Sequence, residues 1–276
     1  MSIAAEKANK PVLVFENLTT GYGTPSRHPV GQGLCATLPT ASITAIVGRN
    51  GAGKSTLLRT LAGLQPALAG SIKWEGEELK AYSPNRLART LSVVLTDKPD
   101  TGWLTAREVV AMGRQPYTGF SGRLTEDDKR ICQQALCDAG AEALTTRPLT
   151  SLSDGERQRV MVAKALAQQT PVILLDEPTA FLDFAGKIAL LQLLQRLSEE
   201  LGKTILLSTH DLELAFQLCH HLWLLSPDGI AAGSPRALAD DGTLSAFFDT
   251  PDVQFDAKEM RFRYPLRNSA SHCSLS

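Results

Sequence analysis

The stretch Gly48-Arg49-Asn50-Gly51-Ala52-Gly53-Lys54-Ser55 decides how the rest of the chain is organised. It follows the apolar, β-branched run at 43–47 and leads into Thr56-Leu57-Leu58-Arg59, which is typical of a helix. Strand, glycine-rich turn and helix in the spacing G-x-x-x-x-G-K-[ST] form the P-loop pattern, whose backbone amides hold phosphate groups. A glycine-rich turn without chemical use is the alternative, and the joint occurrence of strand, spacing and helix disfavours it.

This pattern predicts a bound nucleoside triphosphate, ATP, together with Mg²⁺. Gly51 and Gly53 let backbone N–H groups converge on phosphate oxygens, and Lys54 would reach the β- and γ-phosphates. The Ser55 hydroxyl would be a ligand of Mg²⁺. The nucleotide-binding residues predicted here are Gly48, Asn50, Gly51, Gly53, Lys54, Ser55 and Thr56.

Composition limits the classes of protein that fit. The 276 residues suit one globular domain, and the net charge of −1 argues against a dedicated nucleic-acid binder. No apolar run approaches the ~18 residues of a membrane-spanning helix, and Met1 to Lys10 lack the apolar core of a signal peptide, so we expect a cytoplasmic chain. The five cysteines form no C-x-x-C pair, which predicts reduced thiols rather than disulfides or a metal site.

Strands and helices alternate along the chain. Strands are predicted at 12–15, 34–38, 42–47, 70–74, 91–95, 172–177, 204–208, 222–225 and 229–232, with a terminal hairpin formed by 253–255 and 260–264. Helices are predicted at 104–112, opened by a capping box from Thr105 to Glu108, and at 125–138, 152 to about 168, 184–201 and 211 to about 219. This alternation implies the α/β class, with a mainly parallel sheet covered on both faces.

The strand at 172–177 ends in two acids. Asp176 suits the second protein ligand of Mg²⁺, and Glu177 could polarise the attacking water as a general base. Two capping acids before Pro178 are the plain alternative, which the nearby P-loop disfavours, since such sheets bind ligands at the carboxyl ends of strands. His210, at another strand end, could contact the γ-phosphate or orient water, although a lone histidine in a turn is usually structural.

Two further features stay open from the residues alone. Tyr22 fits a half-buried aromatic in a turn at 21–23 or a stacking platform for adenine. The segment 97–124 combines Trp103, Tyr117 and Phe120 with glycines and charges, which fits a solvated loop or a docking surface.

The order of these motifs resembles the nucleotide-binding subunit of an ABC transporter. The motifs are Tyr22, the P-loop, Leu152-Ser153-Asp154-Gly155-Glu156, Asp176-Glu177, Leu182-Asp183 and His210. The resemblance runs from about residue 12 to about residue 239. It implies an ABC-type cassette of the P-loop NTPases over 12–264, with a mainly parallel core sheet, an antiparallel β region and a helical signature subdomain at about 97–170. We expect 265–276 to be a disordered tail.

The resemblance also implies roles that depend on a second copy of the chain. In that family two cassettes form a homodimer around two ATP molecules. Ser153 and Gly155 would then contact the ATP held by the partner, and Asp183 would act across the dimer interface. Tyr22 would stack on adenine, and His210 would sense the γ-phosphate.

Within the family, Gly113-Arg114-Gln115-Pro116-Tyr117 is similar to importer ATPases for iron-siderophores, haem and vitamin B12. The similarity implies two integral-membrane permease subunits docked at 97–124, a separate solute-binding protein, and a place on the cytoplasmic face of the inner membrane. It implies no nucleic-acid partner. Two other classes are weighed against this one: a soluble ABC ATPase of repair or translation, and a non-hydrolysing nucleotide-dependent regulator.

The chain departs from the family pattern at two places. Asp154 and Glu156 replace glycine and glutamine of the usual L-S-G-G-Q signature, and we expect Asp154 to point away from bound phosphate and Glu156 to pair with Ser153 in a capping box. Thr96 stands where the family has a glutamine that helps to ligate Mg²⁺. Because threonine is shorter, we expect no direct contact with Mg²⁺ and a water in the position of the missing amide.

Overall fold

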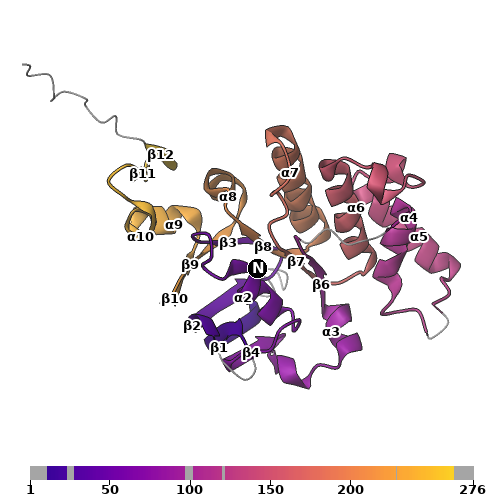
Figure 1. Cartoon of the computed structure of the whole chain (residues 1–276), viewed down its shortest axis with the longest axis horizontal. Helices are drawn as coiled ribbons and strands as arrows, with labels where there is room; N and C mark the ends of the chain where they lie inside the picture. Colours follow the sequence, from indigo (N-terminus) through magenta and orange to yellow (C-terminus); the bar gives the residue numbers. More distant parts are fainter. Residues whose placement is uncertain (1–10, 24–27, 97–101, 120–121, 228, 264–276) are drawn as a thin grey trace, which may run out of the picture.

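The computed structural model describes residues 11–23, 28–96, 102–119, 122–227 and 229–263 (Figure 1). Its centre is a six-stranded sheet with the order β10-β9-β3-β8-β7-β6, in which only β10 runs antiparallel to its neighbour. A four-stranded antiparallel sheet, β2-β1-β4-β5, forms a second layer. The predicted α/β class with a parallel core sheet and an antiparallel region is confirmed.

The strands are β1 (Pro11–Tyr22), β2 (His28–Pro39), β3 (Ile43–Val47), β4 (Ala69–Trp74), β5 (Glu77–Glu78), β6 (Leu91–Val94), β7 (Val172–Leu175), β8 (Thr204–Thr209), β9 (His221–Ser226), β10 (Gly229–Gly233), β11 (Gln254–Asp256) and β12 (Arg261–Arg263). The α-helices are α2 (Lys54–Leu61), α3 (Pro84–Thr90), α4 (Ala106–Ala111), α5 (Glu126–Asp138), α6 (Asp154–Ala167), α7 (Phe184–Leu201), α8 (Leu212–Leu218), α9 (Pro235–Asp240) and α10 (Thr243–Phe248). No helix in the described ranges combines the length and the apolar character that a membrane crossing requires.

The six-stranded sheet is buried on both faces. In β3, Ile43, Ala45 and Val47 face the helices, whereas Ile46 faces the antiparallel sheet. Successive strand residues point to opposite faces, and both faces need apolar side chains here. The continuous apolar runs that predicted these strands therefore reflect their burial in two cores.

The first strand is longer than predicted. The sequence predicted a strand at 12–15 and a turn at 21–23, but β1 continues to Tyr22, where it pairs with His28 of β2. Irregular pairing near Asn17, whose φ is 48°, lets the strand bend without ending. Gly21 is required in this strand because a Cβ there would collide with the carbonyl oxygen of His28.

Helices α4, α5 and α6 pack together at the right of Figure 1. Each begins with a capping box, from Thr105 to Glu108, from Thr125 to Asp128 and from Ser153 to Glu156. The first and third boxes were predicted from the S/T-x-x-E spacing. These three helices lie within the predicted helical subdomain at 97–170.

The last described residues form a small module on the opposite side of the molecule (Figure 1). The predicted hairpin is confirmed as β11 and β12, which pair in antiparallel fashion. Phe216 of α8 contacts Phe248, Phe255 and Phe262 of this module through ring-to-ring packing. The predicted tail at 265–276 lies outside the described residues.

Candidate nucleotide-binding site

The P-loop connects β3 to α2 as the sequence predicts. Gly53 has φ of 93°, and a Cβ there would lie 2.6 Å from Val30 Cγ1, so only glycine fits. The Lys54 ammonium is buried and donates to the carbonyl oxygens of Gly48 and Arg49, at 3.1 and 3.4 Å. Lys54 is therefore held over the loop that would receive the phosphates.

Three side chains and one backbone amide meet near the carboxyl ends of β3, β7 and β8. Asp176 Oδ1 accepts hydrogen bonds from Ser55 Oγ at 2.8 Å and from Ser208 Oγ at 2.7 Å. Ser208 Oγ in turn accepts from the backbone N–H of Glu177 at 2.8 Å. The structure thus brings the predicted Ser55, Asp176 and Glu177 together through Ser208, a residue that the sequence analysis missed.

This cluster has the chemistry that Mg²⁺ requires. Mg²⁺ takes oxygen ligands, and beside a nucleotide it is held by few protein side chains, with phosphate oxygens and waters completing the octahedron. Ser55 Oγ and Asp176 Oδ1 lie 2.8 Å apart, so both oxygens can reach one ion. In the described ranges, no group of three or more His, Cys, Asp or Glu side chains could hold a metal ion without a nucleotide.

Glu177 lies beside this cluster in a strained conformation. Its φ is 43°, a value that non-glycine residues rarely adopt and that is found at functional sites. His210 Nδ1 lies 3.7 Å from Glu177 Oε2, and 46% of the His210 side chain is exposed. The predicted general base and the predicted γ-phosphate sensor are therefore neighbours at two adjacent strand ends.

Tyr22 lies at the edge of the same site. Its hydroxyl is 2.8 Å from Thr56 Oγ1 in the first turn of α2, and 53% of the residue is exposed. The hydrogen bond fixes the ring next to the P-loop and leaves much of its surface free. This position is compatible with stacking on adenine, which stays a prediction.

The altered signature begins α6. Ser153 Oγ accepts from the Glu156 backbone N–H, and Glu156 Oε2 accepts from the Ser153 backbone N–H at 2.9 Å, as the predicted capping box requires. Glu156 also pairs with Arg147 at 2.7 Å. The hydrogen bonds from Ser153, followed by Arg147, lower the pKa of Glu156. Glu156 therefore acts as a helix cap in this chain.

Asp154 and Asp183 also have local partners. Asp154 lies 3.6 Å from the Arg157 guanidinium, and Asp183 is the N-cap of α7, where it accepts from the Gly186 N–H at 2.7 Å. Gly155 lies beside Leu182, with room for a Cβ. Within the described chain, the side-chain hydrogen bonds of Ser153 and Asp183 stay inside the first turns of their own helices.

Thr96 does not extend toward the metal cluster. Its hydroxyl donates to the carbonyl oxygen of Asp176 at 2.8 Å. The hydroxyl proton is used in that bond, so the side chain binds the backbone of the strand end and not its carboxylate. The absence of a direct contact between Thr96 and Mg²⁺ stays a prediction.

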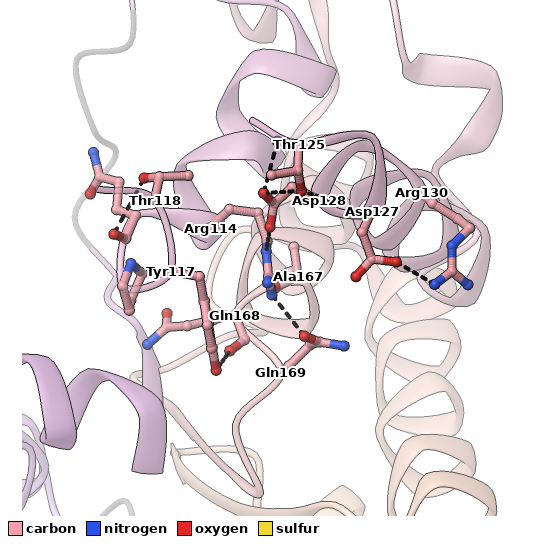
Figure 2. A network of polar contacts seen from close by, with 12 residues as sticks. Arg114, Tyr117, Thr118, Thr125, Asp127, Asp128, Arg130, Ala167, Gln168 and Gln169 are labelled. Carbon is pink, nitrogen blue, oxygen red and sulfur yellow. Dashed lines mark hydrogen bonds and ion pairs between the residues drawn. The ribbon is translucent and has the colours of Figure 1, made fainter. Parts of the chain in front are cut away.

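Arg114 and Tyr117 of the segment predicted to dock a partner belong to a buried polar network (Figure 2). Arg114 Nε donates to Asp128 Oδ1, and Arg114 Nη1 donates to the carbonyl oxygen of Ala167 at the end of α6, both at 2.8 Å. Its guanidinium also lies 4.0 Å from the centre of the Tyr117 ring. Hydrogen bonds from Thr125, followed by that from Arg114, lower the pKa of Asp128 to about 2. Arg114 therefore joins the start of α5 to the end of α6.

The two described aromatic residues of this segment differ in their surroundings. The Tyr117 hydroxyl donates to the Gln168 carbonyl oxygen at 3.0 Å, and Arg89 lies on its ring as Arg114 does. Trp103 is 85% exposed. Tyr117 is thus held by contacts within the subunit, whereas the Trp103 side chain lies on the surface. Phe120 lies outside the described residues.

Comparison with known proteins gives a match to a family model and to several relatives. The sequence model of the family described as ABC transporter matches residues 32–180. The chain belongs to the ABC transporter family. It is 37% identical to the achromobactin transport ATP-binding protein CbrD of Dickeya dadantii, over 86% of this chain and 87% of that protein. It is also 37% identical to the ferric enterobactin transport ATP-binding protein FepC of Escherichia coli, over 81% of this chain and 82% of that protein.

A solved structure of this family shows the same fold. The ABC cassette MJ0796, a dimer in a post-hydrolysis state with ADP and Pi, matches 81% of this chain and 98% of its own with a TM-score of 0.71 and 25% identity. The recognition of an ABC cassette from its motifs is therefore confirmed, and the chain is an ATP-binding ABC ATPase.

Proposed function

We propose that this ABC ATPase hydrolyses ATP to power the import of an iron-siderophore or a related metal chelate such as haem or cobalamin. It would act as a homodimer below two integral-membrane permease subunits, on the cytoplasmic face of the inner membrane. A separate solute-binding protein would deliver the chelate. Relatives named for achromobactin and ferric enterobactin transport support this substrate class.

One observation carries the ATPase proposal: the Ser55, Asp176, Ser208 and Glu177 cluster at the strand ends. Ser55 and Asp176 would hold Mg²⁺, which when bound neutralises charge on the β- and γ-phosphates. Ser208 fixes both the Asp176 carboxylate and the Glu177 backbone. The cluster therefore sets Glu177 at a defined distance from the phosphate that the P-loop holds.

Within that arrangement each remaining side chain has one task. Lys54 leaves the loop carbonyls and binds phosphate oxygens, and Glu177 accepts a proton from the attacking water. His210, beside Glu177, contacts the γ-phosphate. Tyr22 stacks on adenine from its position over Thr56.

In the homodimer, each of the two ATP sites would be formed by residues of both copies. Ser153 and Gly155 at the exposed start of α6 would contact the ATP bound by the partner, and Asp183 would act at the interface. Phe181 and Phe184, next to Asp183, are 58% and 71% exposed. Large apolar side chains at such a surface support burial against a second copy.

Permease docking is proposed for residues 97–124 together with an adjoining apolar groove of about 640 Å³. Leu64, Leu87 and Gln168 line the groove, and Leu64 is 59% exposed. The groove adjoins the docking segment at Gln168, because the carbonyl oxygen of Gln168 accepts a hydrogen bond from the Tyr117 hydroxyl. A cytoplasmic segment of the permease would fill the groove, with Trp103 as a free anchor.

Trp103→Ala should weaken association with permease-containing membranes about tenfold or more, the scale of an aromatic interface anchor. The affinity of the isolated subunit for ATP should stay unchanged, since Trp103 is exposed and away from the P-loop cluster. Co-sedimentation with membranes and equilibrium nucleotide binding measure the two. Leu201→Ala, at the exposed end of α7, is the matched control. Unchanged sedimentation of the Trp103 variant would remove the anchor from the proposal.

The other classes predict different results. A soluble ATPase of repair or translation would not co-purify with a membrane protein, and a non-hydrolysing regulator would release no phosphate from ATP. We expect phosphate release by the wild-type chain and co-purification with its permease. ATP binding without phosphate release, even with permease present, would refute the proposed function.

A further inference from the structure

A small pocket separates the signature helix α6 from the strand end that carries the Mg²⁺ ligands. Its described lining includes Thr96, Asp176 and Glu177 on one side and Gln158 on the other. Its volume is about 40 Å³, enough for a water molecule and far below the several hundred Å³ of a ligand pocket. This pocket lies within one subunit and needs no partner to form.

Gln158 lines this pocket and has an unsatisfied donor. Its Nε2 atom is buried, and no acceptor in the described part of the chain receives a hydrogen bond from it. A buried amide donor without an acceptor is costly, and natural proteins pair such groups with protein atoms or ordered water. The pocket beside Gln158 is polar and large enough to supply that water.

Thr96 offers a matching acceptor across the pocket. Its hydroxyl proton is already donated to the Asp176 carbonyl oxygen at 2.8 Å. The Thr96 oxygen can therefore only accept a further hydrogen bond. A water between the two residues would accept from Gln158 Nε2 and donate to Thr96 Oγ1. The family's longer glutamine at position 96 would occupy the space of this water.

We propose that Gln158 is a positioning residue that holds a buried water against Thr96. The water links α6 to the Asp176 backbone and, through Asp176, to Ser55 and Ser208. Gln158 thereby replaces the amide that the chain lacks at position 96. It fixes the strand end that presents Glu177 but touches neither nucleotide nor Mg²⁺. The inference rests on the proposed hydrolysis at Glu177.

The kinetic test is a double-mutant cycle in the full chain. Gln158→Met keeps the side-chain length without the donor and should lower kcat about fivefold, the scale of one hydrogen bond, with KM for ATP within about twofold. Thr96→Gln should change kcat less than ~10-fold, because its amide displaces the water and can accept from Gln158 directly. The double variant should deviate from the product of the two single effects by about threefold or more, since both act on one water.

The structural test is a crystal structure of the wild-type chain at a resolution that shows ordered water. It should show a water within about 3.2 Å of both Gln158 Nε2 and Thr96 Oγ1. Gln217→Met, an exposed glutamine on α8, controls for the substitution itself. Unchanged kcat in Gln158→Met, effects that simply multiply, or a direct protein acceptor for Gln158 in the crystal would each overturn the proposal. A wild type that releases no phosphate would instead refute the proposed function, and the crystallographic result does not depend on activity.

Discussion

Glu177→Gln should slow ATP hydrolysis by ~10² or more while ATP binding is retained, the usual scale for loss of a general base. The amide keeps the shape of the side chain but cannot take the proton of the attacking water. Since bound ATP would persist, the variant should elute as an ATP-bound dimer in size-exclusion chromatography. Phosphate release and nucleotide affinity, measured on the same preparation, separate catalysis from binding.

Glu199→Gln is the control for this substitution, because Glu199 is an exposed acid near the end of α7. It should leave turnover within about twofold, as expected for a surface change away from the site. Wild-type turnover in Glu177→Gln would exclude Glu177 as the base. The strain at Glu177 and its place beside Ser208 would then need another cause.

Arg114→Met should destabilise the chain by about 3–5 kcal/mol, the cost of removing one partner of a buried ion pair. The change leaves Asp128 buried without its cation and removes the donor to the Ala167 carbonyl oxygen. Urea unfolding monitored by circular dichroism measures the loss. Arg130→Met is a control from the same region, since the Arg130–Asp127 pair is exposed and should contribute no more than about 1 kcal/mol. Equal effects of the two variants would show that the Arg114 network adds no stability.

The same network predicts a pH dependence. The folded-state pKa of Asp128 is about 2, below its ordinary value, so its stabilisation is complete above the unfolded pKa and is lost as the pH falls toward 2. Asp128→Asn should therefore be less stable at neutral pH. Below about pH 5 its unfolding free energy should fall less steeply than that of wild type.

The parts of the site with local sequence signals were predictable. The P-loop, the acids after β7 and the capping boxes at Thr105 and Ser153 each depend on residues within a few positions of one another. Their partners across the fold were not predictable. Ser208 binds Asp176 from 32 positions away, and nothing in the local sequence distinguishes it from any serine at a strand end.

The errors have physical causes too. The turn predicted at 21–23 followed from its glycines, but pairing with β2 uses Gly21 for close backbone approach instead. One role, in a loop or a docking surface, was predicted for both Trp103 and Tyr117. Tyr117 is fixed by two guanidinium groups, whereas Trp103 is exposed. The short helices α3 and α9 were missed, even though Ser83-Pro84 and Ser234-Pro235 are N-cap and N1 signals.

The most direct measurement of the central claim is chelate uptake by the reconstituted importer. Proteoliposomes would contain the permease that co-purifies with this subunit, with the subunit and ATP on the same side of the membrane and the binding protein on the other. Wild-type subunit should drive ATP-dependent accumulation of an iron-siderophore, haem or cobalamin, and Glu177→Gln should abolish it. Steady ATP hydrolysis by the complete complex without accumulation of any of these chelates would contradict the account.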